Sequence, residues 1–305
     1  MKKKYHKRLK KVLEEKWGFS ELKEKQMQII EAIVGEKRDV VGLLPTGYGK
    51  SMTFLIPPLI TKKVCIIISP LISLMEDQKE KLIERNIPVA ALHGNNYNKD
   101  KEVFQIIDNE IHIVYMSPEF LINGDGMELA NTLNNDKMLG LFAIDEAHCT
   151  SVWGHDFRSD YLQLGKFREK FPDIPILAVT ATATFQVVQD IVEYIQLVNP
   201  LLVRADFDRP NLFLKFESAD NNDVSLVVPL IEKYIISQQD NEECQDRIII
   251  YMNSRKDTVD LNEEINNKWK KMSLAYHAGM SKKMRNIIQG KFSSGEVKVI
   301  VSTIA

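Results

Sequence analysis

A glycine-rich turn between an apolar run and a helix-like run constrains the fold of this 305-residue chain most strongly. The turn reads Pro-Thr-Gly-Tyr-Gly-Lys-Ser over residues 45–51 and follows the apolar run at 38–44. Gly47 and Gly49 let the backbone curl, so that successive N–H groups point inward at phosphate oxygens. The helix expected from Ser51 adds the positive end of its dipole. Strand, turn and helix together predict a nucleotide-binding α/β domain with a phosphate loop.

The side chains of this turn predict how it would hold ATP. Lys50 would reach the β- and γ-phosphates, and the Ser51 hydroxyl would ligate Mg²⁺. Leu44 stands where the strict pattern G-x-x-x-x-G-K-[ST] has a glycine. The predicted cofactors are therefore ATP and Mg²⁺. The other nucleotide contacts expected within the turn are Thr46, Gly47 and Gly49.

A second motif, Asp-Glu-Ala-His at residues 145–148, follows an apolar run at 138–144 that is typical of a buried parallel strand. Ligands of open α/β sheets bind where such strands end. Asp145 would hold Mg²⁺ through water, and Glu146 would orient or deprotonate the attacking water. Lys50, Asp145 and Glu146 are thus the predicted catalytic residues, and Ser51 and Asp145 the predicted metal ligands.

Apolar runs alternate with helix-like segments along the whole chain, which predicts parallel sheets covered on both faces. Only the first half has a phosphate loop, so we expect two tandem α/β domains, at 1–205 and 206–305, joined by a linker region at 205–223. Strands are predicted at 38–44, 64–69, 89–92, 111–116, 139–144, 176–180, 247–251, 273–276 and 297–302. Helices are predicted at 2–17, 26–34, from 51, 71–86, 99–109, 224–236, 257–269 and 282–292.

Composition excludes several classes of protein. Hydrophobic residues make up 44% and charged residues 27%, as in ordinary globular proteins. The three cysteines are scattered, which argues against a zinc site within the chain and fits a reducing compartment. No signal core or membrane span is evident, so we expect an intracellular protein, not a secreted one. The net charge of −2 gives no global attraction to nucleic acid, and the basic helix at 2–17 is interpreted as a solvated face.

Further motifs, in a characteristic order, make the chain resemble the RecQ family of superfamily 2 DNA helicases. The aromatic-rich stretch at 151–161 is the most specific of them. It directly follows the Asp-Glu-Ala-His motif and contains Trp153, Phe157 and Arg158. The others are Ser-Pro-Leu-Ile-Ser-Leu-Met-Glu-Asp-Gln at 69–78, Ser-Pro-Glu at 117–119, Val-Thr-Ala-Thr-Ala at 179–183 and Phe-Asp-Arg-Pro-Asn-Leu at 207–212.

The resemblance implies a fold and a reaction. The fold would be two tandem RecA-like domains, the second incomplete, and the activity would be ATP-dependent translocation on single-stranded DNA from 3′ to 5′ with duplex unwinding. Phe19, Lys23 and Gln26 match the adenine-reading motif. The family normally has Phe-Arg where this chain has Leu22 and Lys23. Because lysine lacks the planar guanidinium fork, we expect weaker nucleotide contact there.

The resemblance also implies a site for the tracked DNA strand, and its partner would be single-stranded or partly duplex DNA. The π-faces of Trp153 and Phe157 could stack on unpaired bases, worth about 1–3 kcal/mol per base. Arg158 could bond a phosphate or couple DNA contact to the acidic pair. Ser69 and Ser117 would contact phosphates. Residues expected to relay between nucleotide and DNA are His148, Thr180 and Thr182.

The motif that begins at 299–305 resembles only the opening of the family's motif V. The resemblance places the arginine finger in motif VI, which this sequence lacks, and losing such a cation costs about 10³–10⁵ in rate. A domain ending on an apolar strand would also expose a sheet edge. Three explanations stay open: truncation, completion by a second chain, or a remnant that binds nucleotide and DNA without hydrolysis. A DEAH/DEAD-type RNA helicase is the alternative enzyme.

Overall fold

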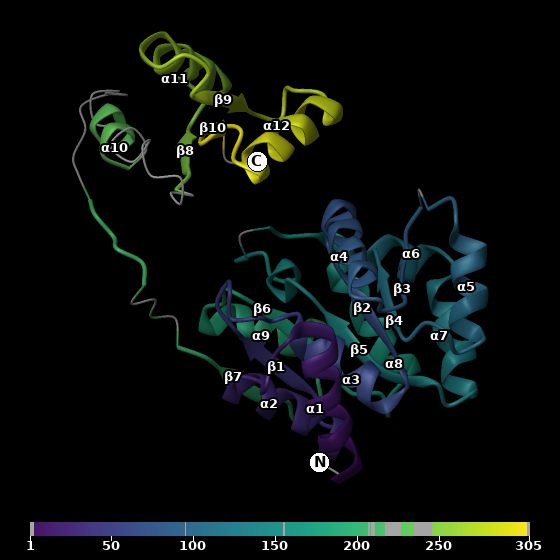
Figure 1. Ribbon diagram of the computed structural model, residues 1–305. Coiled ribbons are helices and arrows are strands. Elements are labelled where there is room, and N and C mark those ends of the chain that lie inside the picture. Colours follow the sequence, from purple (N-terminus) through teal and green to yellow (C-terminus); the bar gives the residue numbers. More distant parts are fainter. Residues whose placement is uncertain are drawn as a thin grey trace. The chain divides into compact units, whose positions relative to one another are not determined.

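The computed structural model describes residues 3–94, 96–154, 156–206, 208, 211–216, 227–234 and 246–303. The chain forms two compact units, Met1–Pro210 and Asn211–Ala305 (Figure 1). Each unit contains an entirely parallel sheet, which confirms the predicted α/β class. Within the described residues, no helix has the length and apolar character needed to cross a membrane.

The first unit is built on a seven-stranded parallel sheet with the order β3-β4-β2-β5-β6-β1-β7. The strand that precedes the glycine-rich turn, β1, is flanked by β6 and β7. The strand that precedes the acidic pair, β5, is flanked by β2 and β6. The strands are β1 (Val40–Leu43), β2 (Val64–Ile68), β3 (Val89–Leu92), β4 (Ile113–Met116), β5 (Leu139–Ile144), β6 (Ile176–Thr180) and β7 (Leu201–Arg204).

Helices cover both faces of this sheet (Figure 1). One face packs against α2 (Glu24–Glu31), α3 (Met52–Thr61) and α4 (Ile72–Glu84), and α1 (Lys3–Trp17) lies over α2 and α3. The other face packs against α5 (Lys99–Ile107), α6 (Pro118–Asn123), α7 (Gly126–Asn135), α8 (Gly165–Lys170) and α9 (Phe185–Tyr194). Shorter helical turns are the π-helix Ala32–Glu36 and the 3₁₀ helices Ala147–Thr150 and Ser159–Leu164.

The continuous apolar runs of the strands explain why both faces are covered. In β2, Val64, Ile66 and Ile68 point into one core, and Cys65 and Ile67 point into the other. All five are fully buried. Because side chains alternate along a strand, such a run leaves no face for solvent and requires a helical layer on each side.

The second unit contains a three-stranded parallel sheet with the order β8-β10-β9. Its core joins Ile231, Leu261 and Ile265 of the helices to Val299 and Val301 of the central strand. Its elements are α10 (Val227–Tyr234), β8 (Ile248–Met252), α11 (Arg255–Lys268), β9 (Ser273–Tyr276), α12 (Lys282–Ser294) and β10 (Val299–Thr303).

Two expectations need correction. The last strand, β10, is not an exposed edge, because it pairs with β8 on one side and β9 on the other. The helix expected at 26–34 changes after Glu31 into a π-helix that ends at Glu36. Parts of other predictions lie outside the described residues: residues 217–223 of the linker region at 205–223, the ends of the helix predicted at 224–236, residues 207, 209 and 210 of the motif at 207–212, and residues 304 and 305 of the motif at 299–305.

Candidate functional site

The glycine-rich turn lies between the end of β1 and the start of α3. Gly47 and Gly49 both have left-handed backbone angles, with φ of 80° and 90°. A Cβ atom at Gly49 would lie 2.6 Å from Nε2 of Gln26. The turn therefore requires glycine at this position both for its conformation and for a close side-chain approach. Thr46 is exposed, and Lys50 and Ser51 are half-buried at the beginning of the helix.

Gln26 connects the start of α2 to this turn. Its Nε2 donates hydrogen bonds to the carbonyl oxygens of Tyr48 and Gly49, each at 3.0 Å, and its Oε1 accepts one from the Lys23 N–H at 2.9 Å. The Lys23 Nζ atom lies 4.6 Å from the centre of the Tyr48 ring. Phe19 is 52% exposed. The structure thus brings Lys23 and Gln26 against the turn, a contact that motif spacing alone did not indicate.

The acidic pair follows β5 at the same edge of the sheet. Glu146 adopts a left-handed conformation with φ 49° and ψ 47°, which is uncommon for a residue with a side chain. Its backbone N–H donates to Asp145 Oδ1 at 3.0 Å. Its Oε1 atom lies 3.1 Å from Lys50 Nζ, and both side chains are largely buried. The predicted catalytic residues Lys50, Asp145 and Glu146 therefore form one cluster.

The environment of Asp145 favours its protonated form. Burial raises the pKa of its carboxyl to about 6, and the negative charge of Glu146 adds to this, while Lys50 acts in the opposite direction. A carboxylate whose charge is this poorly compensated gains from a nearby cation, so the donor set suits a divalent ion held with phosphate oxygens and water. In the described part of the chain, no group of three or more His, Cys, Asp or Glu side chains could hold a metal ion on its own.

A short chain of polar contacts connects this cluster to the end of β6. His148 Nδ1 lies 3.4 Å from Glu146 Oε2 and 2.9 Å from Thr180 Oγ1. Thr180 Oγ1 donates to the Thr182 carbonyl oxygen at 3.1 Å and accepts from the Thr182 N–H at 3.2 Å. The three residues predicted as a relay are therefore joined by a chain of contacts, and His148 links this chain to Glu146.

The aromatic-rich stretch leaves the acidic motif and presents its rings to solvent. Trp153 is 74% exposed and Phe157 is 41% exposed. The Trp153 N–H donates to Ser151 Oγ at 3.1 Å, and Ser151 Oγ in turn donates to the carboxylate of Asp190. These bonds fix the base of the stretch, so the exposure of its rings is a property of the fold rather than of a loose segment.

Two further contacts of this stretch were not evident from the sequence. Arg158 Nη1 donates to the carbonyl oxygen of Pro70 at 2.6 Å, which joins the stretch to the turn after β2. A Cβ atom on Gly154 would lie 2.2 Å from the carbonyl oxygen of His148, so no side chain fits there. The glycine was visible in the motif, but only the folded chain identifies the carbonyl that requires it. Arg158 also pairs with Asp156 at 3.0 Å.

Both serines expected to contact DNA phosphates are buried. Ser69 is 1% exposed, and its Oγ has no hydrogen-bond partner among the described residues. Ser117 is 5% exposed, and its Oγ accepts from the Phe120 N–H at 3.2 Å, so it caps the start of α6. In this structure neither hydroxyl is presented to a ligand at the surface, although both residues lie at the edge that carries the acidic pair.

Comparison with known proteins follows the same division of the chain. The sequence model of the DEAD/DEAH box helicase family matches residues 23–191. The model of the helicase conserved C-terminal domain matches residues 227–305. The first match includes both the glycine-rich turn and the acidic motif.

Curated relatives support the resemblance to RecQ helicases. The chain is 34% identical to the ATP-dependent DNA helicase RecQ of Haemophilus influenzae, over 96% of this chain and 45% of that protein. It is 37% identical to the putative ATP-dependent RNA helicase R290 of Acanthamoeba polyphaga mimivirus, over 99% of this chain and 53% of that protein. The chain thus spans about half the length of these relatives.

A solved structure with the same fold is that of the DUF1998 helicase MrfA bound to DNA and AMPPNP. It matches with a TM-score of 0.73 and 19% sequence identity, covering 99% of this chain and 44% of that one. At this level of identity the likeness concerns the fold alone.

Proposed function

Because the chain belongs to the DEAD/DEAH box helicase family, we propose that it is an ATP-dependent DNA helicase of RecQ type that moves from 3′ to 5′ along single-stranded DNA. The observation that carries the proposal is that two groups of residues lie at the same edge of the sheet. The Lys50–Glu146 pair and the exposed rings of Trp153 and Phe157 lie on neighbouring segments of one sheet edge. A nucleotide site beside solvent-exposed aromatic rings is what a motor on single-stranded nucleic acid requires.

The residues at this edge have different roles in binding and hydrolysing ATP. The backbone N–H groups of the turn at 45–51 hold the phosphates, and the Lys50 ammonium neutralises charge on the β- and γ-phosphates. Ser51 and Asp145 would hold Mg²⁺, which would neutralise the negative charge that develops on the phosphates. Glu146 orients the attacking water and accepts its proton. Lys50 must leave Glu146 to reach phosphate, so nucleotide binding frees this carboxylate for its role.

The adenine end of ATP is assigned to the segment before α2. Phe19 is sufficiently exposed to stack on the adenine ring, and Lys23 and Gln26 follow it on the segment that leads into α2. Gln26 already uses its amide to bond the carbonyls of the glycine-rich turn. A base that competes for this amide would therefore change the support of the turn, so base recognition and phosphate binding depend on the same side chain.

We assign DNA contact to the aromatic-rich stretch, and we assign the coupling of ATP hydrolysis to DNA contact to the polar residues next to it. Trp153 and Phe157 stack on unpaired bases, and Arg158 holds the stretch to Pro70. The contacts from Glu146 through His148 to Thr180 and Thr182 provide a path between water activation and the neighbouring strand end. We assign the phosphate contacts of the turns after β2 and β4 to backbone groups, because Ser69 and Ser117 are buried.

The test is ATP hydrolysis by the purified chain with and without single-stranded DNA. We expect DNA to stimulate hydrolysis, and we expect Lys50→Ala and Glu146→Gln to abolish it. Trp153→Ala should reduce stimulation by DNA while leaving hydrolysis without DNA within about twofold. Phe104→Ala is the matched control, since Phe104 is 69% exposed on α5, away from the acidic motif. The proposal fails if the Lys50 and Glu146 variants hydrolyse ATP as the parent does.

A second candidate is an RNA helicase, because the mimivirus relative carries that name. The same assay separates the two functions when RNA and DNA strands of equal length and sequence are compared. Stronger stimulation by DNA supports the RecQ-type assignment. Stronger stimulation by RNA supports an RNA helicase instead, and the assignment of the nucleotide site is then unchanged.

A further inference from the structure

Helix α1 concentrates positive charge in a chain whose net charge is −2. It contains seven Lys or Arg residues and only two acidic ones, Glu14 and Glu15, both in its second half. The Glu14 carboxylate lies 3.9 Å from Lys10 Nζ, and the Glu15 carboxylate lies 3.7 Å from Lys11 Nζ. These acids therefore neutralise positive charge only in the middle of the helix. The first half of α1 has no acidic residue at all.

Two other cations of α1 fix it to the domain. Arg8 Nη1 donates to the carbonyl oxygen of Ile60 at 3.0 Å, near the end of α3. Lys16 Nζ donates to the carbonyl oxygens of Arg85 and Asn86, at 3.2 and 2.9 Å, just beyond α4. Cations are favourable at helix C-termini, where carbonyl groups lack partners. With Leu9 and Leu13 buried below, α1 is a fixed support and not a loose tail.

Three lysines of α1 make no ion pair with a carboxylate of the described residues, although the Lys4 Nζ atom lies 5.0 Å from the centre of the Tyr5 ring. Lys3, Lys4 and Lys7 are exposed, and among the described residues no carboxylate lies within 4.0 Å of their Nζ atoms. Lys3 and Lys7 are four positions apart and therefore share a face, separated by about 6 Å along the axis. That separation is close to two phosphate steps on one strand of a duplex, which are about 3.4 Å each along its axis.

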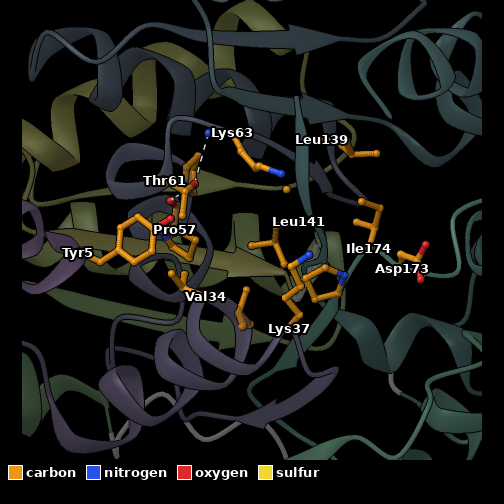
Figure 2. A pocket seen from close by; sticks show the side chains of 14 residues that line it. Tyr5, Val34, Lys37, Pro57, Thr61, Lys63, Leu139, Leu141, Asp173 and Ile174 are labelled. Atoms are coloured by element: carbon orange, nitrogen blue, oxygen red, sulfur yellow. Dashed lines mark hydrogen bonds between the residues drawn. The ribbon is translucent and has the colours of Figure 1, made fainter. Parts of the chain in front are cut away.

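The basic surface continues beyond α1 at the edge where the strands begin. Tyr5 lines a hollow together with Lys37, Lys63 and one acidic residue, Asp173, and Figure 2 shows these side chains. Lys63 immediately precedes β2, and its stem lies against Gly140, where a Cβ would be only 2.6 Å from the Lys63 Cβ. The acidic pair and the aromatic-rich stretch follow strand ends, so this surface lies at the opposite edge of the sheet.

We propose that Lys3, Lys4 and Lys7 of α1, continued by Lys37 and Lys63, form a second DNA-binding surface that holds duplex DNA by its phosphates. Single-strand sites combine basic groups with aromatic platforms for stacking. The exposed positions of α1 carry Lys, Arg, His and Glu side chains, and its tyrosine, Tyr5, is half-buried and lines the hollow. Duplex DNA presents the denser row of phosphates and needs no base contact. The surface thus binds a stretch of DNA separate from the strand at Trp153.

The test uses the full chain without nucleotide and a fluorescent blunt-ended duplex, with affinity measured between about 50 and 200 mM salt. The variant is Lys3→Gln/Lys4→Gln/Lys7→Gln, since glutamine keeps the helix propensity of lysine. The control is Lys81→Gln/Lys101→Gln/Lys166→Gln, which neutralises three exposed lysines elsewhere in the same unit. We expect the α1 variant to lose at least about tenfold in duplex affinity at the lower salt concentration. The slope of log affinity against log salt should fall by about 2.7.

Two results would overturn the inference. One is an equal salt slope for the α1 variant and the control. The other is an equal loss of affinity for oligo-dT, which would make the surface a single-strand site. Hydrolysis of ATP without DNA should be the same in both variants and the parent. If DNA fails to stimulate hydrolysis but the α1 variant still loses duplex affinity, the proposed motor function fails and this surface stands.

Discussion

At the scale of single residues, the site depends on an acidic side chain in an unfavourable setting. Asp145 is placed by the end of β5, and its backbone N–H bonds the carbonyl oxygen of Ile68. Burial and the neighbouring Glu146 charge raise the pKa of its carboxyl to about 6. At neutral pH the Asp145 carboxyl is therefore ionised in a setting that disfavours its charge, which destabilises the folded chain. A ligand that brings a cation to Asp145 would reduce this destabilisation.

Replacing this carboxyl by an amide should stabilise the nucleotide-free chain. The folded pKa of Asp145 is raised above the ordinary 3.8, so stability gained by protonation is complete below about pH 4 and lost as pH rises through 6. Asp145→Asn should raise the unfolding free energy of the first unit by about 3 kcal/mol at pH 7.5 and by only about 0.5 kcal/mol at pH 4. Thermal unfolding across this pH range measures it, with the exposed Asp108→Asn as control. A pH-independent increment would contradict the assignment.

Gly154 offers a second test at this scale. Gly154→Ala forces a methyl group against the His148 carbonyl oxygen, and such overpacking costs about 1–3 kcal/mol. We expect the aromatic-rich stretch to shift, so that half-maximal stimulation of hydrolysis needs about tenfold more single-stranded DNA. Gly290→Ala is the control, because a Cβ there meets nothing within 4 Å. Unchanged DNA dependence would show that the stretch tolerates displacement.

At the scale of elements, a buried ion pair organises the edge of the sheet opposite the site. Asp39, just before β1, accepts two hydrogen bonds from Arg168 Nη2 of α8, at 2.6 and 2.7 Å. It also accepts from the backbone N–H groups of Ile176 and Val198, each at 2.8 Å. One carboxylate therefore fixes the entry to β6 and the segment before β7 against β1, which carries the glycine-rich turn.

Breaking this pair from one side should be costly. Arg168→Met leaves Asp39 buried without its cation, so we expect a loss of about 3–5 kcal/mol in unfolding free energy. The double variant Asp39→Asn/Arg168→Met should recover part of that loss, because no uncompensated charge remains, although the amide oxygen can accept from only one of the two backbone N–H groups. Lys25→Ala, which breaks the solvent-exposed pair with Glu24, should cost far less, because water screens the charges. Denaturant unfolding compares the four proteins, and equal losses for Arg168→Met and Lys25→Ala would refute the role of the buried pair.

Prediction from sequence succeeded where apolar runs were long and clearly bounded. The bounds of β3, β5, β6 and β9 agree with the predicted ranges to the residue. It missed the edge strand β7, in which Leu202 is more than half exposed, and the helices α6, α7, α8 and α9. Three of these elements, β7, α6 and α8, have only four to six residues, so they show little of the periodicity on which such prediction rests.

The candidate site was foreseen to a similar degree, and for related reasons. Motifs led to the predictions for Lys50, Glu146 and Trp153, because the proposed chemistry depends on residue type and spacing. Contacts between distant segments were not foreseen, as with Gln26 to the glycine-rich turn and Arg158 to Pro70. Such contacts depend on the order of the strands, which sequence spacing does not specify. The buried Ser69 and Ser117 show the converse, since a motif can place a residue at the correct edge without exposing its side chain.

At the scale of the whole molecule, the chain has separate cores. Three apolar clusters lie within the first unit and one lies within the second. In the described residues, Leu261 belongs to the core of the second unit and Leu133 to a core of the first, and both are nearly inaccessible to solvent. A leucine-to-alanine change in such a position costs about 2–5 kcal/mol, and the cost should remain in the unit that contains the cavity.

Hydrogen exchange tests this independence directly. Leu261→Ala should lower amide protection across residues 246–303 and leave the strands of the first unit unchanged, because local stability follows the cooperative unit in which a residue packs. Leu133→Ala should have the reciprocal effect on the first unit. The two leucines are matched in size and burial, so each variant controls for the other. If either substitution lowers amide protection equally in both units, the two units unfold cooperatively. A destabilising substitution in one unit then lowers the stability of the other as well. If the effects remain separate, the two units have independent stabilities.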